Sequence, residues 1–151
     1  MRLTTKGRFA VTAMMDIAMR GDATPVTLSE ISSRQQISLS YLEQLFGKLR
    51  KNSLVSSVRG PGGGYKIEQP LTSITIGKII RAVDERVDST QCKGKRNCVG
   101  DDECITHDLW SGLNEHIFRY MDGVCLSDLV NKRKQKSSGI AAVRFEKRLH
   151  H

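Results

Sequence analysis

The sequence of 151 residues has no stretch of the roughly 18 consecutive apolar residues from which a membrane-spanning helix is built. Its first residues, MRLTTKGR, carry positive charge but lead into no apolar segment of the kind found in secretory signals. These two absences predict a cytoplasmic protein without a membrane partner. In that reducing compartment the four cysteines are better suited to metal binding than to disulfides.

The sequence also lacks the common phosphate-binding motifs. The pattern G-x-x-x-x-G-K-[ST] does not occur, and the glycine-rich stretch 60–64 departs from G-x-G-x-x-G because Tyr65 occupies the last position. The residues after this stretch have the pattern of a strand, whereas a phosphate-binding loop of this type leads into a helix. We therefore expect no nucleotide site, and we predict no catalytic residues and no enzymatic activity.

Cysteine pairs with the C-x2–4-C spacing of structural zinc sites are missing as well. In their place stands C-x5-C-x5-C, formed by Cys92, Cys98 and Cys104, with His107 following after two intervening residues. Thiolate and imidazole are the ligands that soft metals prefer, so these four residues are candidate metal ligands. They could close a tetrahedral zinc site or hold a 2Fe–2S cluster with two ligands per iron, and the spacing leaves both alternatives open.

The remaining cysteine, Cys125, is a poor candidate for a ligand. If one helix continued from Cys104, a rise of ~1.5 Å per residue would place Cys125 about 30 Å away in the same subunit. Only an antiparallel partner helix would bring it close to the other cysteines. We interpret Cys125 as a small buried or capping residue.

Positive charge is abundant but unevenly distributed along the chain. The net charge is +8, with +6 in residues 1–66, −2 in residues 67–110 and +4 in residues 111–151. A basic N-terminal part favours a polyanionic partner, and nucleic acid is the first candidate. The alternative is a solvated basic surface without a specific partner, and charge alone does not decide between the two.

Hydrophobic periodicity predicts three helices and a hairpin in the first part of the chain. Two short helices joined by a tight turn form a helix-turn-helix, and a hairpin directly after them makes it a winged helix. We therefore assign residues 1–70 to a winged-helix DNA-binding domain. The expected helices cover residues 4–20, 27–35 and 38–51, and the expected strands cover residues 54–58 and 65–67.

The third of these helices would be the recognition helix. Its first turns would meet base edges in a major groove, and its later basic residues would lie nearer the phosphates. The glycine-rich turn between the strands is thin enough to carry an arginine into a minor groove. The alternative is a polar helix in a protein-interaction domain. The predicted DNA-contacting residues are Ser38, Ser40, Tyr41, Glu43, Gln44, Lys48, Arg50, Lys51, Arg59 and Gly60.

The second half of the chain is predicted to hold the metal site and a dimer interface. A fourth helix, capped by Thr75, would lead into a charged loop at 84–103 that carries the first two cysteines. A long helix from about 103 to 122 has an apolar stripe, and pairing with a second copy is the simple way to bury it. The alternative is packing back on its own domain. We assign residues 71–131 to the cluster-binding loop and the dimerisation helices.

The end of the chain is predicted to be unstructured. From residue 132 the sequence is basic and poor in large apolar residues, so 132–151 should form a loose, disordered tail. His150 and His151 could be the remains of a purification tag and are given no function. The expected fold is therefore mainly α: a winged helix-turn-helix with a two-stranded hairpin wing and a long C-terminal dimerisation helix.

Three stretches carry a resemblance to a known family. They are MRLTTKGRFAVTAM at the start, ISLSYLEQLFGKLRKNSLVSSVRGPGGGY over the recognition helix and the wing, and C-x5-C-x5-C-x2-H. Through residues 1–130 the sequence resembles the iron–sulfur cluster regulators (IscR), a bacterial family of winged-helix transcription factors. The resemblance implies a homodimer that binds double-stranded operator DNA and a 2Fe–2S cluster, with Cys92, Cys98, Cys104 and His107 as the ligands.

The resemblance also implies a regulatory role. Cluster-loaded protein would repress the operon for cluster assembly, the cluster-free form would act at other promoters, and the iron–sulfur assembly machinery would supply the cluster. Nitric-oxide-sensing relatives share the three cysteines but not generally the histidine, so His107 favours the cluster regulator. Cys125 departs from the family pattern, where a threonine is expected to cap the last helix. A nitric-oxide- or redox-sensing regulator, a zinc-stapled repressor and an electron-transfer subunit are the alternatives.

Overall fold

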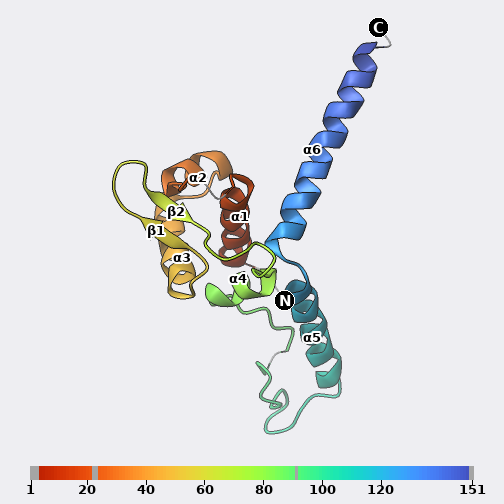
Figure 1. The fold of residues 1–151 in the computed structure, drawn as a ribbon. Coiled ribbons are helices and arrows are strands. Elements are labelled where there is room, and N and C mark those ends of the chain that lie inside the picture. Colours follow the sequence, from red (N-terminus) through yellow and green to blue (C-terminus); the bar gives the residue numbers. More distant parts are fainter. Residues whose placement is uncertain (1–3, 22–23, 91, 150–151) are drawn as a thin grey trace.

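The computed structural model of the chain describes residues 4–21, 24–90 and 92–149, with side chains described as far as residue 138 (Figure 1). The expected mainly helical fold with one antiparallel two-stranded hairpin is confirmed. None of the helices in these ranges has the length and apolarity that crossing a bilayer requires. The elements are α1 (Thr5–Met19), α2 (Leu28–Gln35), α3 (Leu39–Lys51), β1 (Ser56–Val58), β2 (Gly64–Lys66), α4 (Ile76–Ala82), α5 (His107–Gly123) and α6 (Leu126–Leu149).

The helix-turn-helix consists of α2 and α3, which pack against α1. Thr27 caps α2 in a capping box, in which its hydroxyl accepts from the amide of Glu30 and the Glu30 carboxylate accepts from the amide of Thr27. The helix ends at Gln35, and the following residue, Gln36, turns the chain with a left-handed φ of 56°. Ser38 then caps α3 by accepting a 3.2 Å hydrogen bond from the amide of Tyr41. The apolar stripe of α3 is buried in the core and consists of Leu42, Leu45, Phe46 and Leu49.

The wing is a short hairpin whose connecting loop projects from the body (Figure 1). It is fastened to the helices by a bridge between Val26 and Tyr65, whose backbones exchange hydrogen bonds of 2.8 and 2.7 Å. A Cβ atom on Gly64 would lie 2.5 Å from the Val26 carbonyl oxygen, so this close approach requires glycine. The strand register is Ser56↔Lys66, Ser57↔Tyr65 and Val58↔Gly64.

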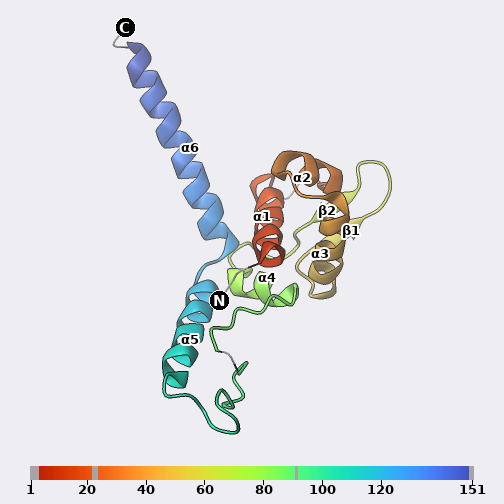
Figure 2. The ribbon, with the colours of Figure 1, turned by 180° about the vertical axis from the view of Figure 1, so that it is seen from behind.

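The last two helices form an arm beside the winged helix, with the loop before α5 at one end and α6 extending away at the other (Figures 1 and 2). Leu126 and Val130 anchor the start of α6 in the core that α1 also lines. The loose tail predicted from residue 132 is instead the helical continuation of α6 to Leu149. Lysine, arginine, glutamine and alanine are good helix formers, and no proline interrupts them here. His150 and His151 lie outside the described residues.

Candidate metal centre

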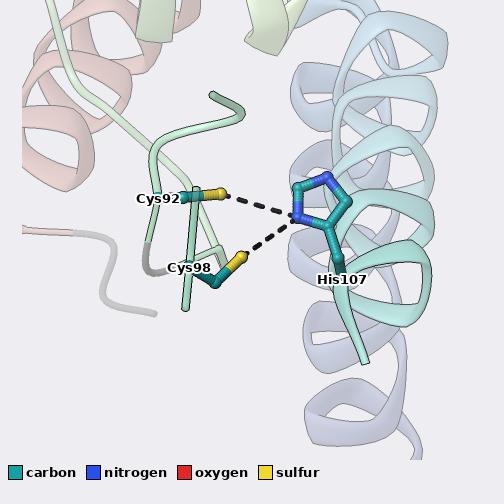
Figure 3. A group of neighbouring side chains, drawn as sticks. All are labelled: Cys92, Cys98 and His107. Atoms are coloured by element: carbon teal, nitrogen blue, oxygen red, sulfur yellow. Dashed lines mark hydrogen bonds between the residues drawn. The ribbon is translucent and has the colours of Figure 1, made fainter. Parts of the chain in front are cut away.

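Three of the four candidate ligands meet beside the start of α5 (Figure 3). The Nδ1 atom of His107 lies 3.5 Å from the Sγ atom of Cys92 and 3.4 Å from that of Cys98. The three donor atoms lie within 4.8 Å of one another. In a tetrahedral site with bonds of ~2.3 Å to sulfur and ~2.0 Å to nitrogen, two such ligands are about 3.6 Å apart. The observed separations therefore fit donors that face a common metal atom.

Cys104 borders this group but does not belong to it. The long helix was predicted to begin at about residue 103, and this is wrong, because α5 begins only at His107. The preceding Thr106 has φ −108° and ψ 8°, outside helical geometry, and Cys104 lies in the turn before it. The Cys104 thiol contacts the Thr106 hydroxyl at 3.7 Å. The Thr106 hydroxyl, and after it the Cys98 thiol, lower the pKa of Cys104.

A hydrogen-bond network holds the loop around Cys92 against α5. Asp88 Oδ1 accepts from the side-chain amide of Asn114 on α5 at 2.7 Å, and from the amide and hydroxyl of Thr90 at 2.8 and 2.7 Å. The Thr90 hydroxyl accepts in turn from the amide of Gly94 at 3.0 Å. The loop is thus fixed on both sides of Cys92, and α5 serves as its support. No local pattern in the sequence indicates this network, because its two halves are about 25 positions apart.

The thiols of the group differ in how readily they ionise. Burial raises the pKa of Cys92, but hydrogen bonds from the Cys98 thiol and from two backbone amides outweigh burial and lower it to about 6. The Cys104 amide favours the Cys98 thiolate, but burial and the two neighbouring thiols outweigh that amide and raise the pKa of Cys98. Because thiolates rather than thiols bind metals, Cys92 is prepared for a metal at neutral pH.

The second ring nitrogen of His107 also has a partner. His107 is only 3% exposed, and its Nε2 atom lies 3.2 Å from the hydroxyl oxygen of Ser111, one turn further along α5. Sequence reasoning missed Ser111. The signal that could have found it is the spacing of four residues, which places both side chains on one face of a helix.

A cavity of about 410 Å³ opens beside the thiols and the imidazole. Since a water molecule takes up only ~30 Å³ in the liquid, the cavity has room for a small inorganic group. Trp110 forms part of its wall, held by a 3.1 Å hydrogen bond from its indole nitrogen to the Thr106 hydroxyl. The lining residues are Ser89, Thr90, Cys98, Cys104, Thr106, His107, Trp110 and Leu113.

Cys125 lies at the start of α6, apart from this group. The carboxylate of Asp128 accepts hydrogen bonds from its amide at 3.0 Å and from its thiol at 3.1 Å. The carboxylate thus satisfies an amide at the beginning of the helix, as capping residues do. Asp128 therefore supplies the cap, with the Cys125 thiol donating to it, and the role of a small buried or capping residue for Cys125 stays a prediction.

The predicted DNA-contacting residues lie on α3 and on the wing. Tyr41 is half-buried because its ring packs edge-on against Phe9, with the ring centroids 5.8 Å apart. Lys48 is also half-buried, and its ammonium group lies 3.1 Å from the carboxylate of Asp84. That any of them contacts DNA stays a prediction. The other eight are exposed: Ser38, Ser40, Glu43, Gln44, Arg50, Lys51, Arg59 and Gly60.

Two adjacent carboxylates connect the start of the loop 84–103, the candidate metal-binding loop, to the winged helix. Asp84 pairs with Lys48 of α3. Glu85 is 7% exposed and reaches the first turn of α1, where it accepts from the amide of Gly7 at 2.7 Å and from the hydroxyl of Thr4. Burial raises the pKa of Glu85, but the bonds from Thr4 and Gly7 outweigh burial and lower it. The loop that carries the first two candidate ligands is therefore in direct contact with two helices of the winged-helix domain.

Comparison with known proteins agrees with this architecture. Residues 3–132 match the Rrf2 family, described as an iron-dependent transcriptional regulator. The chain is 56% identical over 134 residues to the HTH-type transcriptional regulator IscR of Escherichia coli, with 89% of this chain and 83% of that protein covered. Two solved structures are similar with TM-scores of 0.75. IscR of T. potens is 32% identical over 90% of each chain, and CymR, the global cysteine regulator of B. subtilis, is 30% identical over 87% of this chain and 98% of that one. The chain belongs to the Rrf2 family and is an IscR-like transcriptional regulator with a winged-helix fold.

Proposed function

We propose that this regulator senses the supply of iron–sulfur clusters by binding a 2Fe–2S cluster at Cys92, Cys98, Cys104 and His107. The observation that carries the proposal is the convergence of two thiols and one imidazole at the wall of a cavity. The Cys92 thiol contacts His107, and the Cys98 thiol lowers the pKa of Cys104, so Cys104 is the fourth candidate beside this group. Each iron of a 2Fe–2S cluster takes two protein ligands. When bound, the cluster would supply the signal, since its presence reports cluster supply.

A zinc-stapled repressor is the second candidate. The separations of 3.5 and 3.4 Å from Nδ1 to the two sulfurs also suit the ligands of a single tetrahedral ion. Zinc has no redox chemistry and no visible colour, whereas iron–sulfur clusters are coloured. The two candidates therefore differ in a simple measurement.

Protein purified and reconstituted without oxygen should be red-brown, with visible absorption and about two iron and two sulfide per chain. The physical reason is the soft donor set, which suits an iron–sulfur cluster. Absorption spectroscopy together with metal and acid-labile sulfide analysis checks this. A colourless protein that retains one zinc per chain would contradict the cluster and favour the zinc-stapled repressor.

We further propose that a homodimer binds operator DNA with α3 in the major groove and Arg59 in an adjacent minor groove. The exposure of most polar and basic residues of α3 supports the first contact, and the thin glycine tip of the wing supports the second. Leu109, Trp110 and Tyr120 leave apolar surface exposed on α5, which a second copy of the chain would cover. The assembly machinery that the family resemblance implies would be the cluster donor.

Binding to operator DNA should weaken steeply as salt rises, with a slope of about −0.9 per neutralised phosphate, because each contact releases a counterion. Replacing Arg59 with alanine should cost about 1–3 kcal/mol of binding free energy. Titrations of a labelled duplex at several salt concentrations measure both effects. Arg133→Ala, at an exposed position of α6, is the matched control and should bind like the wild type. A flat salt response would exclude the groove-binding arrangement.

We infer that the metal-binding loop acts on DNA binding through Asp84 and Glu85. Asp84 reaches Lys48 on α3, and Glu85 reaches Gly7 on α1. If the loop folds around a bound metal centre, these two carboxylates would take up positions different from those in the metal-free protein. The two winged helices of a dimer would then contact their DNA half-sites differently in the metal-bound and the metal-free protein. A ligand can shift a switch only if the two states differ in such contacts.

A further inference from the structure

The two ring nitrogens of His107 have different neighbours. Nδ1 faces the thiols of Cys92 and Cys98, and Nε2 faces the hydroxyl of Ser111 at 3.2 Å. His107 is the first residue of α5, so one regular helical turn brings Ser111 into contact with it. The imidazole is almost completely buried, and solvent therefore competes little for Nε2.

We propose that Ser111 is a positioning residue of the metal centre, which holds the His107 ring so that Nδ1 stays directed at Cys92 and Cys98. A neutral imidazole carries one hydrogen, and only the nitrogen without it can bind a metal. When Nδ1 binds a metal, the hydrogen sits on Nε2. The Nε2–H group then donates a hydrogen bond to the hydroxyl oxygen of Ser111. This inference rests on the proposed function, because it takes His107 as a ligand.

A hydroxyl suits a ligand that must bind and release. It can accept a hydrogen bond from Nε2–H, and it can also donate one to a bare Nε2 when Nδ1 carries the hydrogen. The ring thus keeps its partner and its orientation in both tautomers. A carboxylate or carbonyl at this place would accept only, and it would favour the metal-binding tautomer alone. Ser111 therefore keeps the ring aligned in the loaded and the cluster-free protein.

The test compares Ser111→Ala with Ser111→Thr, which keeps the hydroxyl, and with His107→Ala, which removes the ligand. Removing the partner of a metal-bound histidine typically costs 10–100-fold in metal affinity. We expect Ser111→Ala to lose its visible absorption to an iron chelator about 10-fold faster than the wild type. Ser111→Thr, which keeps the hydroxyl, should lose its visible absorption as slowly as the wild type. Ser137→Ala, at an exposed position of α6, is the matched control and should behave as the wild type.

A second readout uses the cluster-free protein with Co²⁺ as the probe. Ser111→Ala should bind Co²⁺ about 10-fold more weakly, with a weaker histidine contribution to its absorption spectrum. Far-ultraviolet circular dichroism of the metal-free variant should show the helix content of the wild type, because alanine is a better helix former than serine. An effect confined to the metal-bound forms separates positioning from a structural role.

The outcomes distinguish this inference from the proposed function. If Ser111→Ala retains cluster and Co²⁺ like the wild type while His107→Ala loses them, Ser111 has no positioning role and the ligand set stands. If His107→Ala also retains both, His107 is not a ligand, and the ligand set and this inference fail together.

Discussion

Replacing Cys92 with alanine should abolish the coloured centre, whereas replacing Cys125 with alanine should leave it intact. The Cys92 sulfur is buried, lies 3.5 Å from the Nδ1 atom of His107, and has a pKa lowered to about 6, so at neutral pH it is mostly a thiolate ready for metal. Cys125 is instead held by Asp128 at the start of α6. Both variants replace one thiol group with a hydrogen atom, which makes them a matched pair.

The measurement is visible absorption and acid-labile sulfide after identical anaerobic reconstitution of both variants. Far-ultraviolet circular dichroism of the cluster-free proteins should show the same helix content as the wild type, which excludes misfolding as the cause. A Cys92→Ala protein that keeps the full colour would remove this cysteine from the ligand set. Loss of colour in a well-folded Cys125→Ala protein would show that the fourth cysteine is required after all.

Local patterns were enough to predict the winged helix and most of the candidate metal-binding group. The capping box of Thr27 and Glu30 and the apolar stripe of α3 depend on residues three or four positions apart, and the structure has both. The spacing of Cys92, Cys98 and His107 likewise predicted a group that the structure assembles. In these cases the residues that interact are near one another in the chain, so periodicity and spacing contain the information.

Other features depend on contacts that no local pattern contains. Glu85 reaches Gly7 across 78 positions, and neither residue signals the other in the sequence. The start of α5 was placed too early because an apolar stripe identifies a helix but not its first residue, which the backbone of Thr106 decides here. The tail from residue 132 was predicted to be disordered because scarce apolar residues indicate little packing, whereas good helix formers can still continue α6 to Leu149.

Replacing Glu85 with glutamine should destabilise the protein and weaken the coupling between the metal centre and DNA binding. The carboxylate accepts hydrogen bonds at the first turn of α1, where helix amides have no partner within the helix and negative charge is favoured. Losing hydrogen bonds to a buried charged group costs about 1.5–3 kcal/mol of unfolding free energy. Urea unfolding of the cluster-free proteins measures this loss, and Glu115→Gln, at an exposed position of α5, is the control.

The pH dependence of that loss follows from the direction of the pKa shift. Hydrogen bonds from Thr4 and Gly7, opposed by burial, hold the pKa of Glu85 below its ordinary value of 4.5. The stabilisation is therefore fully present above pH 4.5 and is lost as the pH falls through the pKa of the folded state. The difference in unfolding free energy between the wild type and Glu85→Gln should be largest near neutral pH and should shrink below pH 4.5. A difference that grows in acid would contradict the assigned contacts.

The same variant tests whether the metal-binding loop acts on the winged helix through this carboxylate. In the wild type, operator affinity should differ between cluster-loaded and cluster-free protein, and Glu85→Gln should reduce that difference while both forms still bind DNA. Glu85 lies at the start of the loop, against α1, and touches none of the candidate ligands. The cluster content of the variant should therefore remain that of the wild type. Anisotropy titrations of both forms on one labelled duplex measure the difference. If the variant keeps the full difference despite its lower stability, the coupling runs through other contacts, of which the Asp84–Lys48 pair is the next to test.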